Sequence, residues 1–160
     1  MLAIRKNVLI IATSLILLIS GSLLQAATKI NINRGSSEPI PFYLDNPEFN
    51  SYSLGKMPYQ VRELIINDLE SSGLFEHKVP IDITDATSDY FKEPDFNKWQ
   101  AQKITTVITA RVDAIGNNQL RFSYRIWDMV SRSLVKQHQI AVKAKHWRRG
   151  AHKIANDIYL

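Results

Sequence analysis

The stretch that decides the fold is residues 104–143, ITTVITARVDAIGNNQLRFSYRIWDMVSRSLVKQHQIAVK. Within it, Leu120, Phe122, Tyr124 and Ile126 alternate with the residues between them, and this period of two is typical of a half-buried strand. In chain order the stretch comprises a strand at 104–115, a turn at 116–119, a strand at 120–127, a turn at 131–133 and a strand at 134–143. Consecutive strands joined by short turns predict an antiparallel meander.

Helices flank this meander in the sequence. Before it comes an apolar stripe at helical spacing, formed by Val61, Leu64, Ile65 and Leu69. Pro58 suits the first turn of that helix, and Gly73 suits the position just past its end. A short helix is predicted from Asp95, as its N-cap, to Lys103. After the meander comes a closing helix with a second apolar stripe, formed by Trp147, Ala151, Ile154 and Ile158.

The remaining sequence predicts shorter elements. Residues 29–34 and 40–44 are expected to be strands, and Pro41 indicates a sheet edge or a strand start, because proline cannot donate to the ladder. Residues 79–84 predict a brief strand, whereas 45–55 and 85–98 predict loops. The expected fold class is α/β (α+β): one mixed β-sheet of about five strands, with the C-terminal antiparallel meander and the strand from Ile40, packed by two main helices over one or both faces.

The first 27 residues have the pattern of a secretory signal peptide. Arg5 and Lys6 precede an apolar run at residues 8–19, and small residues follow it. We expect cleavage between residues 22 and 28, which leaves residues 28–160 as one domain; an uncleaved membrane anchor is the alternative. The absence of cysteine excludes disulfides, thiolate metal sites, a cysteine nucleophile and lipoprotein anchoring.

Charge is unevenly distributed along the chain, whose formal net charge is +5. Residues 28–102 hold seven Lys and Arg against twelve Asp and Glu, whereas residues 103–160 hold eleven against three. A basic C-terminal half suggests either one solvated basic face or a site for an anionic partner. Nucleic-acid binding by this half is the alternative function, although export from the cytoplasm disfavours it.

Sequence patterns for catalysis or cofactor binding are missing. There is no nucleophile elbow and no glycine-rich phosphate loop, because the six glycines are scattered singly. The four histidines lack the spacing of a zinc pair; they are His77, His138, His146 and His152. Two pairs of carboxylates lie in polar loops, where they lack the apolar surroundings that would suit them to acid–base catalysis; they are Asp82/Asp85 and Glu93/Asp95. We therefore expect no catalytic residue, no metal, no cofactor and no enzymatic activity.

Two aromatic–charge clusters and one short strand are the candidates for binding. The clusters are Trp127-Asp128 and residues 146–149 (HWRR), which predict either a core-flanking tryptophan with an exposed basic turn or an anionic docking patch. The strand is the segment 28–35, which ends at a flexible Gly-Ser-Ser loop. A strand at a new N-terminus can pair within its own sheet or with the sheet edge of a partner.

Three stretches resemble the amino-terminal domain of the TolB family. Residues 62–75 (RELIINDLESSGLF) are similar to a family helix with a Ser-Gly-x-Phe exit, and residues 120–130 (LRFSYRIWDMV) to a strand with an Arg-(Leu/Ile)-Trp-Asp core. Residues 147–159 (WRRGAHKIANDIY) resemble its closing helix, with the signature Arg-Arg-x-Ala-His-Lys-Ile-Ala. The similarity extends from about residue 28 to residue 160, in the family's order.

The resemblance implies a periplasmic α/β domain that works by protein–protein contact in the Tol-Pal system. That system supports outer-membrane integrity, cell division and protein import. In the family the mature N-terminus docks on the C-terminal domain of the inner-membrane protein TolA. By position and pattern this role carries over to Lys29, Ile30, Asn31, Ile32, Asn33 and Arg34.

The resemblance ends before the family's second domain. The family continues into a C-terminal β-propeller, which binds Pal and which colicins exploit, and we expect no propeller in this chain. Binding of Pal or of colicins is therefore not expected of this chain. We expect a truncated gene product, one half of a split gene or a stand-alone domain; a non-functional fragment is an alternative to the docking function.

Overall fold

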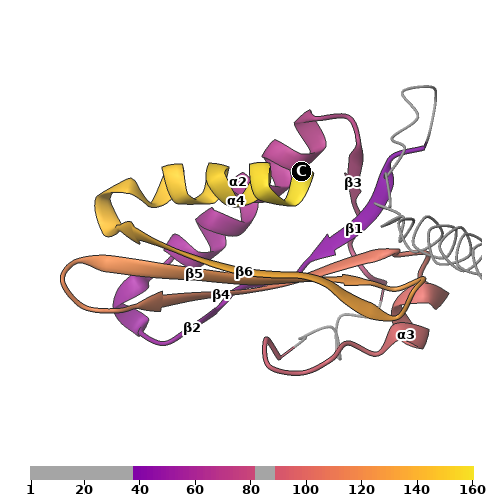
Figure 1. The fold of residues 1–160 in the computed structure, drawn as a ribbon, viewed down its shortest axis with the longest axis horizontal. Coiled ribbons are helices and arrows are strands. Elements are labelled where there is room, and N and C mark those ends of the chain that lie inside the picture. The colour runs from indigo at the N-terminus through magenta and orange to yellow at the C-terminus, as the bar shows by residue number, and fades with distance from the viewer. Residues whose placement is uncertain (1–37, 82–88) are drawn as a thin grey trace, which may run out of the picture. The chain divides into compact units, whose positions relative to one another are not determined.

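A computed structural model describes residues 38–81 and 89–160 of the chain, and within them one mixed six-stranded sheet carries the fold (Figure 1). The strands are β1 (Ile40–Leu44), β2 (Glu48–Phe49), β3 (Phe75–His77), β4 (Thr106–Ala114), β5 (Gln119–Asp128) and β6 (Ser133–Lys143). The helices are α2 (Met57–Ser71), α3 (Phe96–Ala101) and α4 (Trp147–Tyr159), with 3-10 turns η1 (Tyr52–Leu54) and η2 (Ala144–His146).

The sheet combines a parallel and an antiparallel half. Its strand order is β3-β1-β4-β5-β6, and the short β2 pairs with β4 outside this path. β1 runs parallel to both β3 and β4, whereas β4, β5 and β6 are antiparallel neighbours. The mixed sheet, the C-terminal meander and the inclusion of the strand from Ile40 are thereby confirmed.

Two local predictions of element position need correction. The brief strand expected at residues 79–84 is wrong for 79–81, and 82–84 lie outside the described residues. The chain pairs earlier, in β3, because Phe75 to His77 lie beside β1. The expected loop at 45–55 contains β2 and η1. Of the two positions that Pro41 indicated, the strand start is confirmed, because Pro41 is the second residue of β1 and β1 has neighbours on both sides.

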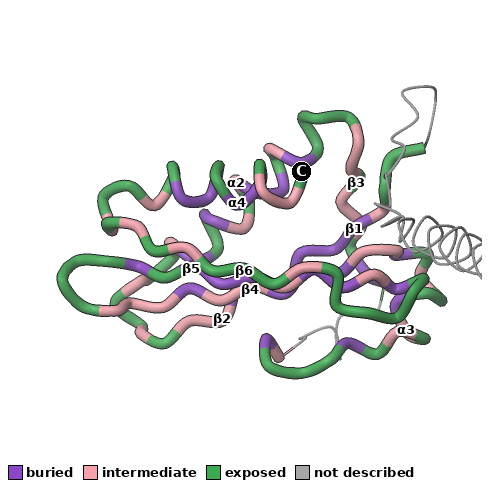
Figure 2. Tube along the Cα trace, viewed as in Figure 1, coloured by how far each residue is buried: buried purple, intermediate pink, exposed green. Residues whose placement is uncertain are grey.

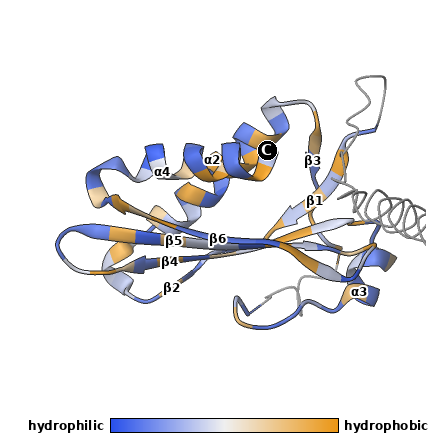
Figure 3. Ribbon diagram, viewed as in Figure 1, coloured by the Kyte–Doolittle hydropathy of each residue, from blue (hydrophilic) through white to orange (hydrophobic). Residues whose placement is uncertain are grey.

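The main core lies between one face of the sheet and the helices α2 and α4. These two helices run over the same face, and the buried residues line their inner sides and the strands beneath them (Figures 1 and 2). The predicted stripes point inward: Val61, Ile65 and Leu69 of α2 and Ala151 and Ile154 of α4 are buried in one core cluster with residues of β1, β4 and β5. Hydrophilic residues cover the side of α4 that faces away from the sheet (Figure 3).

A second, smaller core lies on the opposite face of the sheet, next to α3. It is formed by Tyr43, Trp99, Ile104, Val107, Trp127 and Met129. Trp127 of β5 is therefore buried, Ser123 of β5 is also buried, and the middle of β5 is covered on both faces. The alternation in β5 is real, but its description as half-buried is wrong because α3 packs on the second face.

Helix ends follow the local sequence signals. Gly73 has a φ of 72°, the left-handed conformation that terminates α2 at low cost for glycine. Asp95 caps α3 as expected, since its carboxylate accepts hydrogen bonds from the backbone N–H groups of Asn97 and Lys98. Among the described residues, no helix has the length and apolar character needed to cross a membrane.

Candidate functional site

The predicted docking residues lie before the described part of the structure. Lys29, Ile30, Asn31, Ile32, Asn33 and Arg34 all precede residue 38, where the described residues begin. Their role in binding therefore stays a prediction. The carboxylates Asp82 and Asp85 likewise lie outside the described residues.

The four histidines are distributed over the domain, three of them in contacts within the fold. His138 and His152 contact the carboxylates of Asp157 and Asp68, each at 2.7 Å. His146 is exposed at the turn before α4. In residues 38–81 and 89–160, no group of three potential ligands could hold a metal ion.

His77 is the histidine most affected by its surroundings. Its ring stacks on Tyr43 with ring centroids 5.9 Å apart, and its Nε2 lies 3.4 Å from a guanidinium nitrogen of Arg62. Burial lowers the pKa of His77, and the positive charge of Arg62 lowers it further. Burial and the nearby carboxylate of Asp45 raise the pKa of Tyr43 to about 12. These contacts join β1, β3 and α2, so they are structural.

Asp157 is the centre of a polar cluster that joins α4 to the sheet. Its carboxylate contacts Nδ1 of His138, accepts a hydrogen bond from the Tyr124 hydroxyl and pairs with Lys136 at 2.9 Å. The hydrogen bonds with His138 and Tyr124 hold the pKa of Asp157 well below its usual range. Burial, followed by the contact with Asp157, raises the pKa of Tyr124. A carboxylate held ionised in this way is suited to fixing a helix rather than to accepting protons in catalysis.

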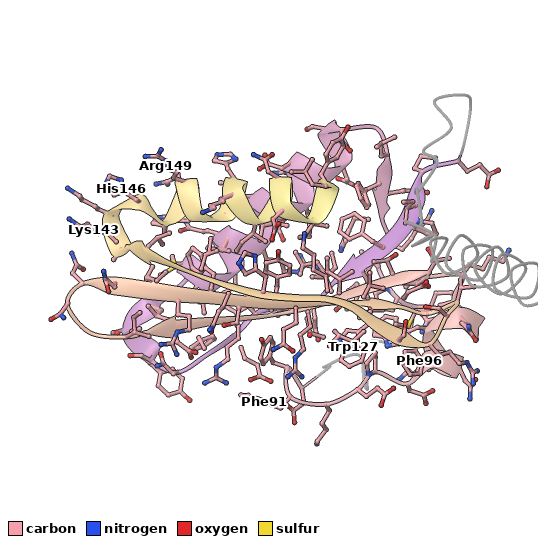
Figure 4. The ribbon with its side chains drawn as sticks, in the orientation of Figure 1. Phe91, Phe96, Trp127, Lys143, His146 and Arg149 are labelled. Carbon is pink, nitrogen blue, oxygen red and sulfur yellow. The ribbon has the colours of Figure 1, made fainter. Side chains whose placement is uncertain are left out.

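The Trp127-Asp128 cluster is part of the fold. Trp127 is buried in the second core, with its ring 6.4 Å from that of Phe96 (Figure 4). Asp128 closes the turn between β5 and β6, where it accepts hydrogen bonds from the backbone N–H of Val130 and the hydroxyl of Ser131. Of the two interpretations of this cluster, the core-flanking tryptophan is confirmed.

The arginines on the face of the sheet opposite α2 and α4 are engaged by neighbouring groups. Arg111 pairs with Glu48 and Asp113, each at 2.9 Å, and these carboxylates raise the pKa of its guanidinium. Arg125 lies 4.8 Å from the centre of the Tyr90 ring and donates to the Tyr90 carbonyl oxygen. The Arg111 guanidinium also lies 5.2 Å from the centre of the Phe91 ring, so both arginines contact the segment before α3 and do not form an open basic face.

The basic residues between β6 and α4 are exposed. Lys143, His146 and Arg149 lie together where the chain passes from β6 through η2 into α4, and they project away from the sheet (Figure 4). Next to them, the Arg148 guanidinium lies 4.3 Å from the centre of the Trp147 ring. The exposed basic turn expected from residues 146–149 is thus present, and Trp147 packs partly against the main core.

A groove between α2 and α4 opens beside this turn. Its volume is about 660 Å³, and it is lined by Lys56, Tyr59, Gln60, Glu63, Leu64, Asn67, Trp147 and Arg148. Most of the lining surface is apolar. The sequence did not predict this groove, because its walls come from two helices about 90 residues apart. The exposed Tyr59 outside the apolar stripe of α2 was the one local signal.

The comparisons with known proteins bear on this domain as a whole. A family model described as the TolB amino-terminal domain matches residues 28–135, more than half of the chain. The chain belongs to the TolB amino-terminal domain family. Two of the three stretches that carried the resemblance, 62–75 and 120–130, lie within the matched residues.

Curated relatives of this TolB-family chain are Tol-Pal system proteins. It is 26% identical over 137 residues to the Tol-Pal system protein TolB of Paramagnetospirillum magneticum, covering 84% of the chain and 30% of that protein. The corresponding protein of Rickettsia bellii is 28% identical over 134 residues, with the same coverage of 84% and 30%. The chain therefore spans about 30% of the length of these relatives.

Solved structures share the fold of this TolB-type domain. TolB from Acinetobacter baumannii superposes with a TM-score of 0.58 at 18% identity, over 78% of this chain and 28% of that one. The hypothetical protein CT253 of Chlamydia trachomatis gives a TM-score of 0.51 at 12% identity, over 63% of this chain and 69% of that one. At such identities the likeness concerns the fold alone.

Proposed function

We propose that this chain is a periplasmic, non-enzymatic interaction domain of a Tol-Pal-type envelope complex. In this proposal residues 1–27 direct export, residues 28–160 form the domain, and the chain docks to a TolA-like inner-membrane protein. Its role is to support outer-membrane integrity, cell division and protein import. The observation that carries the proposal is the family match over residues 28–135, because it includes the predicted docking segment.

The proposed mechanism is strand addition by residues 29–34. Ile30 and Ile32 alternate with Lys29, Asn31 and Asn33, so one side of an extended segment is apolar and the other polar. Such a segment can supply main-chain hydrogen bonds to the edge of a partner's sheet and place its apolar side chains in pockets. The contacts form without covalent chemistry, so docking and release are reversible.

A pull-down from envelope extract tests this docking. The full chain is expressed from all 160 codons, so that the cell can export it, beside a variant that lacks residues 28–35. We expect the full chain to retain a TolA-like protein and the deletion variant to lose it. Equal retention by both would refute the docking segment.

Matched substitutions separate the two sides of the segment. Ile30→Asp with Ile32→Asp changes the apolar side, and Asn31→Asp with Asn33→Asp adds the same charge to the polar side. The isoleucine variant should lose the partner, and the asparagine variant should keep most of it. Loss in both variants would point to net charge rather than to strand addition.

Localisation distinguishes this function from the alternatives. N-terminal sequencing should find a mature chain that begins between residues 22 and 28, in the periplasmic fraction. An intact Met1 in the cytosol would favour nucleic-acid binding by the basic half. A properly exported chain that fails to retain any Tol protein would favour a non-functional fragment, and turnover in a hydrolase screen would contradict a non-enzymatic role.

A further inference from the structure

The turn between β6 and α4 concentrates positive charge on one exposed corner of the domain. This basic corner consists of Lys143, Lys145, His146, Arg148 and Arg149, all of them exposed. Residues 129–160 contain seven Lys and Arg against a single acidic residue, Asp157. That carboxylate is already engaged by Tyr124, Lys136 and His138. Within the described residues, the basic corner has no ion pair with a carboxylate.

The position of these charges is unfavourable for the isolated domain. Arg148 and Arg149 lie in the first turn of α4, which contains no acidic residue and has no side-chain cap. The N-terminal end of a helix carries a partial positive charge, so cations there are repelled. Clustered like charges repel each other as well. Carboxylates from outside the domain would relieve both repulsions.

The groove between α2 and α4 adds an apolar recess next to these charges. Trp147 and Leu64 pack against the main core from within the groove, and Tyr59 remains 45% exposed. The Arg148 guanidinium, stacked on Trp147, brings a positive charge to the rim. Aromatic and arginine side chains around an apolar recess are typical of the centres of protein–protein interfaces.

We propose that the basic corner and the α2–α4 groove together bind an acidic segment of a partner protein. The carboxylates of the segment lie on Lys145, Arg148 and Arg149, and one apolar side chain of the segment enters the groove beside Tyr59 and Trp147. This surface is formed by residues 56–67 and 143–149, so it is separate in sequence from the docking segment 28–35. The inference does not depend on the proposed function and adds a second binding surface to it.

The charge and shape of the surface favour a protein segment over nucleic acid or a lipid surface. A strand of nucleic acid needs a basic track that follows successive phosphates. The meander does not continue such a track, because Arg111 and Arg125 are engaged by neighbouring groups. Adsorption to an anionic bilayer needs no recess of about 660 Å³ with an aromatic wall. A peptide that carries acidic residues around one large apolar residue matches both features.

Selection from a random dodecapeptide library displayed on phage tests the chemistry without assuming a partner. The immobilised full chain should enrich peptides in which Asp and Glu flank one aromatic or large aliphatic residue. Enrichment of peptides without acidic residues, or no enrichment over an empty support, would overturn the proposal.

Charge reversal then tests where the most enriched peptide binds. Lys145→Glu with Arg149→Glu should weaken its binding by about tenfold or more at low salt. Lys78→Glu with Lys92→Glu makes the same net-charge change elsewhere, at side chains that are 43% and 78% exposed, and binding should stay within about twofold. An equal loss in both variants would mean attraction to net charge alone and would overturn the site.

Tyr59→Ala tests the groove at an exposed position, so that the fold is retained. We expect a loss of about fivefold or more for the selected peptide, and none for a peptide whose apolar residue is replaced by serine. Unchanged binding in the Tyr59 variant would overturn the role of the groove. Competition by single-stranded DNA or by phosphatidylglycerol vesicles at lower concentrations than the peptide would overturn the choice of a protein partner.

Discussion

The Tyr124 hydroxyl donates a hydrogen bond to Oδ2 of Asp157 and thereby joins the middle of β5 to the last turn of α4. The same carboxylate contacts Lys136 and His138 of β6, so one side chain of α4 is bonded to two adjacent strands. The apolar side chains of Ile154 and Ala155, which lie nearby in α4, are buried in the main core. The cluster therefore fixes the end of α4 on the edge half of the sheet.

Removal of the Tyr124 hydroxyl should lower stability without changing the fold. Tyr124 is 1% exposed, so Tyr124→Phe keeps the ring in the core and removes one hydrogen bond to a charged acceptor. We expect a loss of about 1–2 kcal/mol in the free energy of unfolding, measured by urea denaturation. Tyr59→Phe is the control at a 45% exposed position, and should change stability by less than about 0.5 kcal/mol. Equal effects would contradict a stabilising role for the bond.

Acid should weaken the domain through Asp157. Because hydrogen bonds hold the folded pKa of Asp157 below its ordinary value, the folded state binds this proton less readily than the unfolded state. The stability from this group is therefore present above the unfolded pKa of about 4 and is lost as pH falls further. Urea midpoints of the chain should decline below about pH 4, and more steeply than those of Asp157→Asn. Parallel pH profiles would contradict the assignment.

Sequence patterns predicted those elements of the fold whose structure depends on residues close together in the chain. The alternation of Leu120 to Ile126 identified the central strand. Asp95 marked the start of α3 through its side-chain cap, and Gly73 marked the end of α2 through its positive φ. β3 was not predicted, because a strand of three residues is too short to show an alternation of apolar and polar residues. Its pairing with β1 depends on tertiary packing.

In the candidate binding surface, too, only the part formed by residues close together in the sequence could be predicted. The basic turn at residues 146–149 was visible as a charge run, since neighbouring residues form it. The groove beside it was not, because Tyr59 and Trp147 come together only when α2 packs on α4. The burial of Trp127 also depends on distant residues, as α3 covers the second face of β5. Spacing along the chain carries no signal for such contacts.

Gly150 should be intolerant of a side chain although it lies in a helix. Glycine to alanine ordinarily stabilises a helix by about 1 kcal/mol. Here an added Cβ would lie 2.5 Å from Cε2 of Phe122, which is 1% exposed, and 3.2 Å from Cγ1 of Val142. The overlap forces α4 away from β5, and we expect a net loss of about 1–3 kcal/mol in urea denaturation. A gain in stability would show that Phe122 can move aside. Phe122→Leu should partly rescue Gly150→Ala by shortening the opposing ring.

Charge reversal at Arg149 should stabilise the domain while it weakens peptide binding. Arg149 lies in the first turn of α4, where no acidic residue balances the partial positive charge of the helix end. Arg149→Glu removes a repelled cation and adds an attracted anion, so we expect a gain of about 1 kcal/mol and a higher Tm. Lys153→Glu makes the same charge change beyond the first turn, and its gain should be smaller because the effect of the helix end falls off within one turn. Equal gains would mean that general repulsion, rather than the helix end, is responsible. A loss of peptide binding in a more stable Arg149→Glu variant cannot come from unfolding, so opposite signs of the two effects would assign Arg149 to binding rather than to the fold.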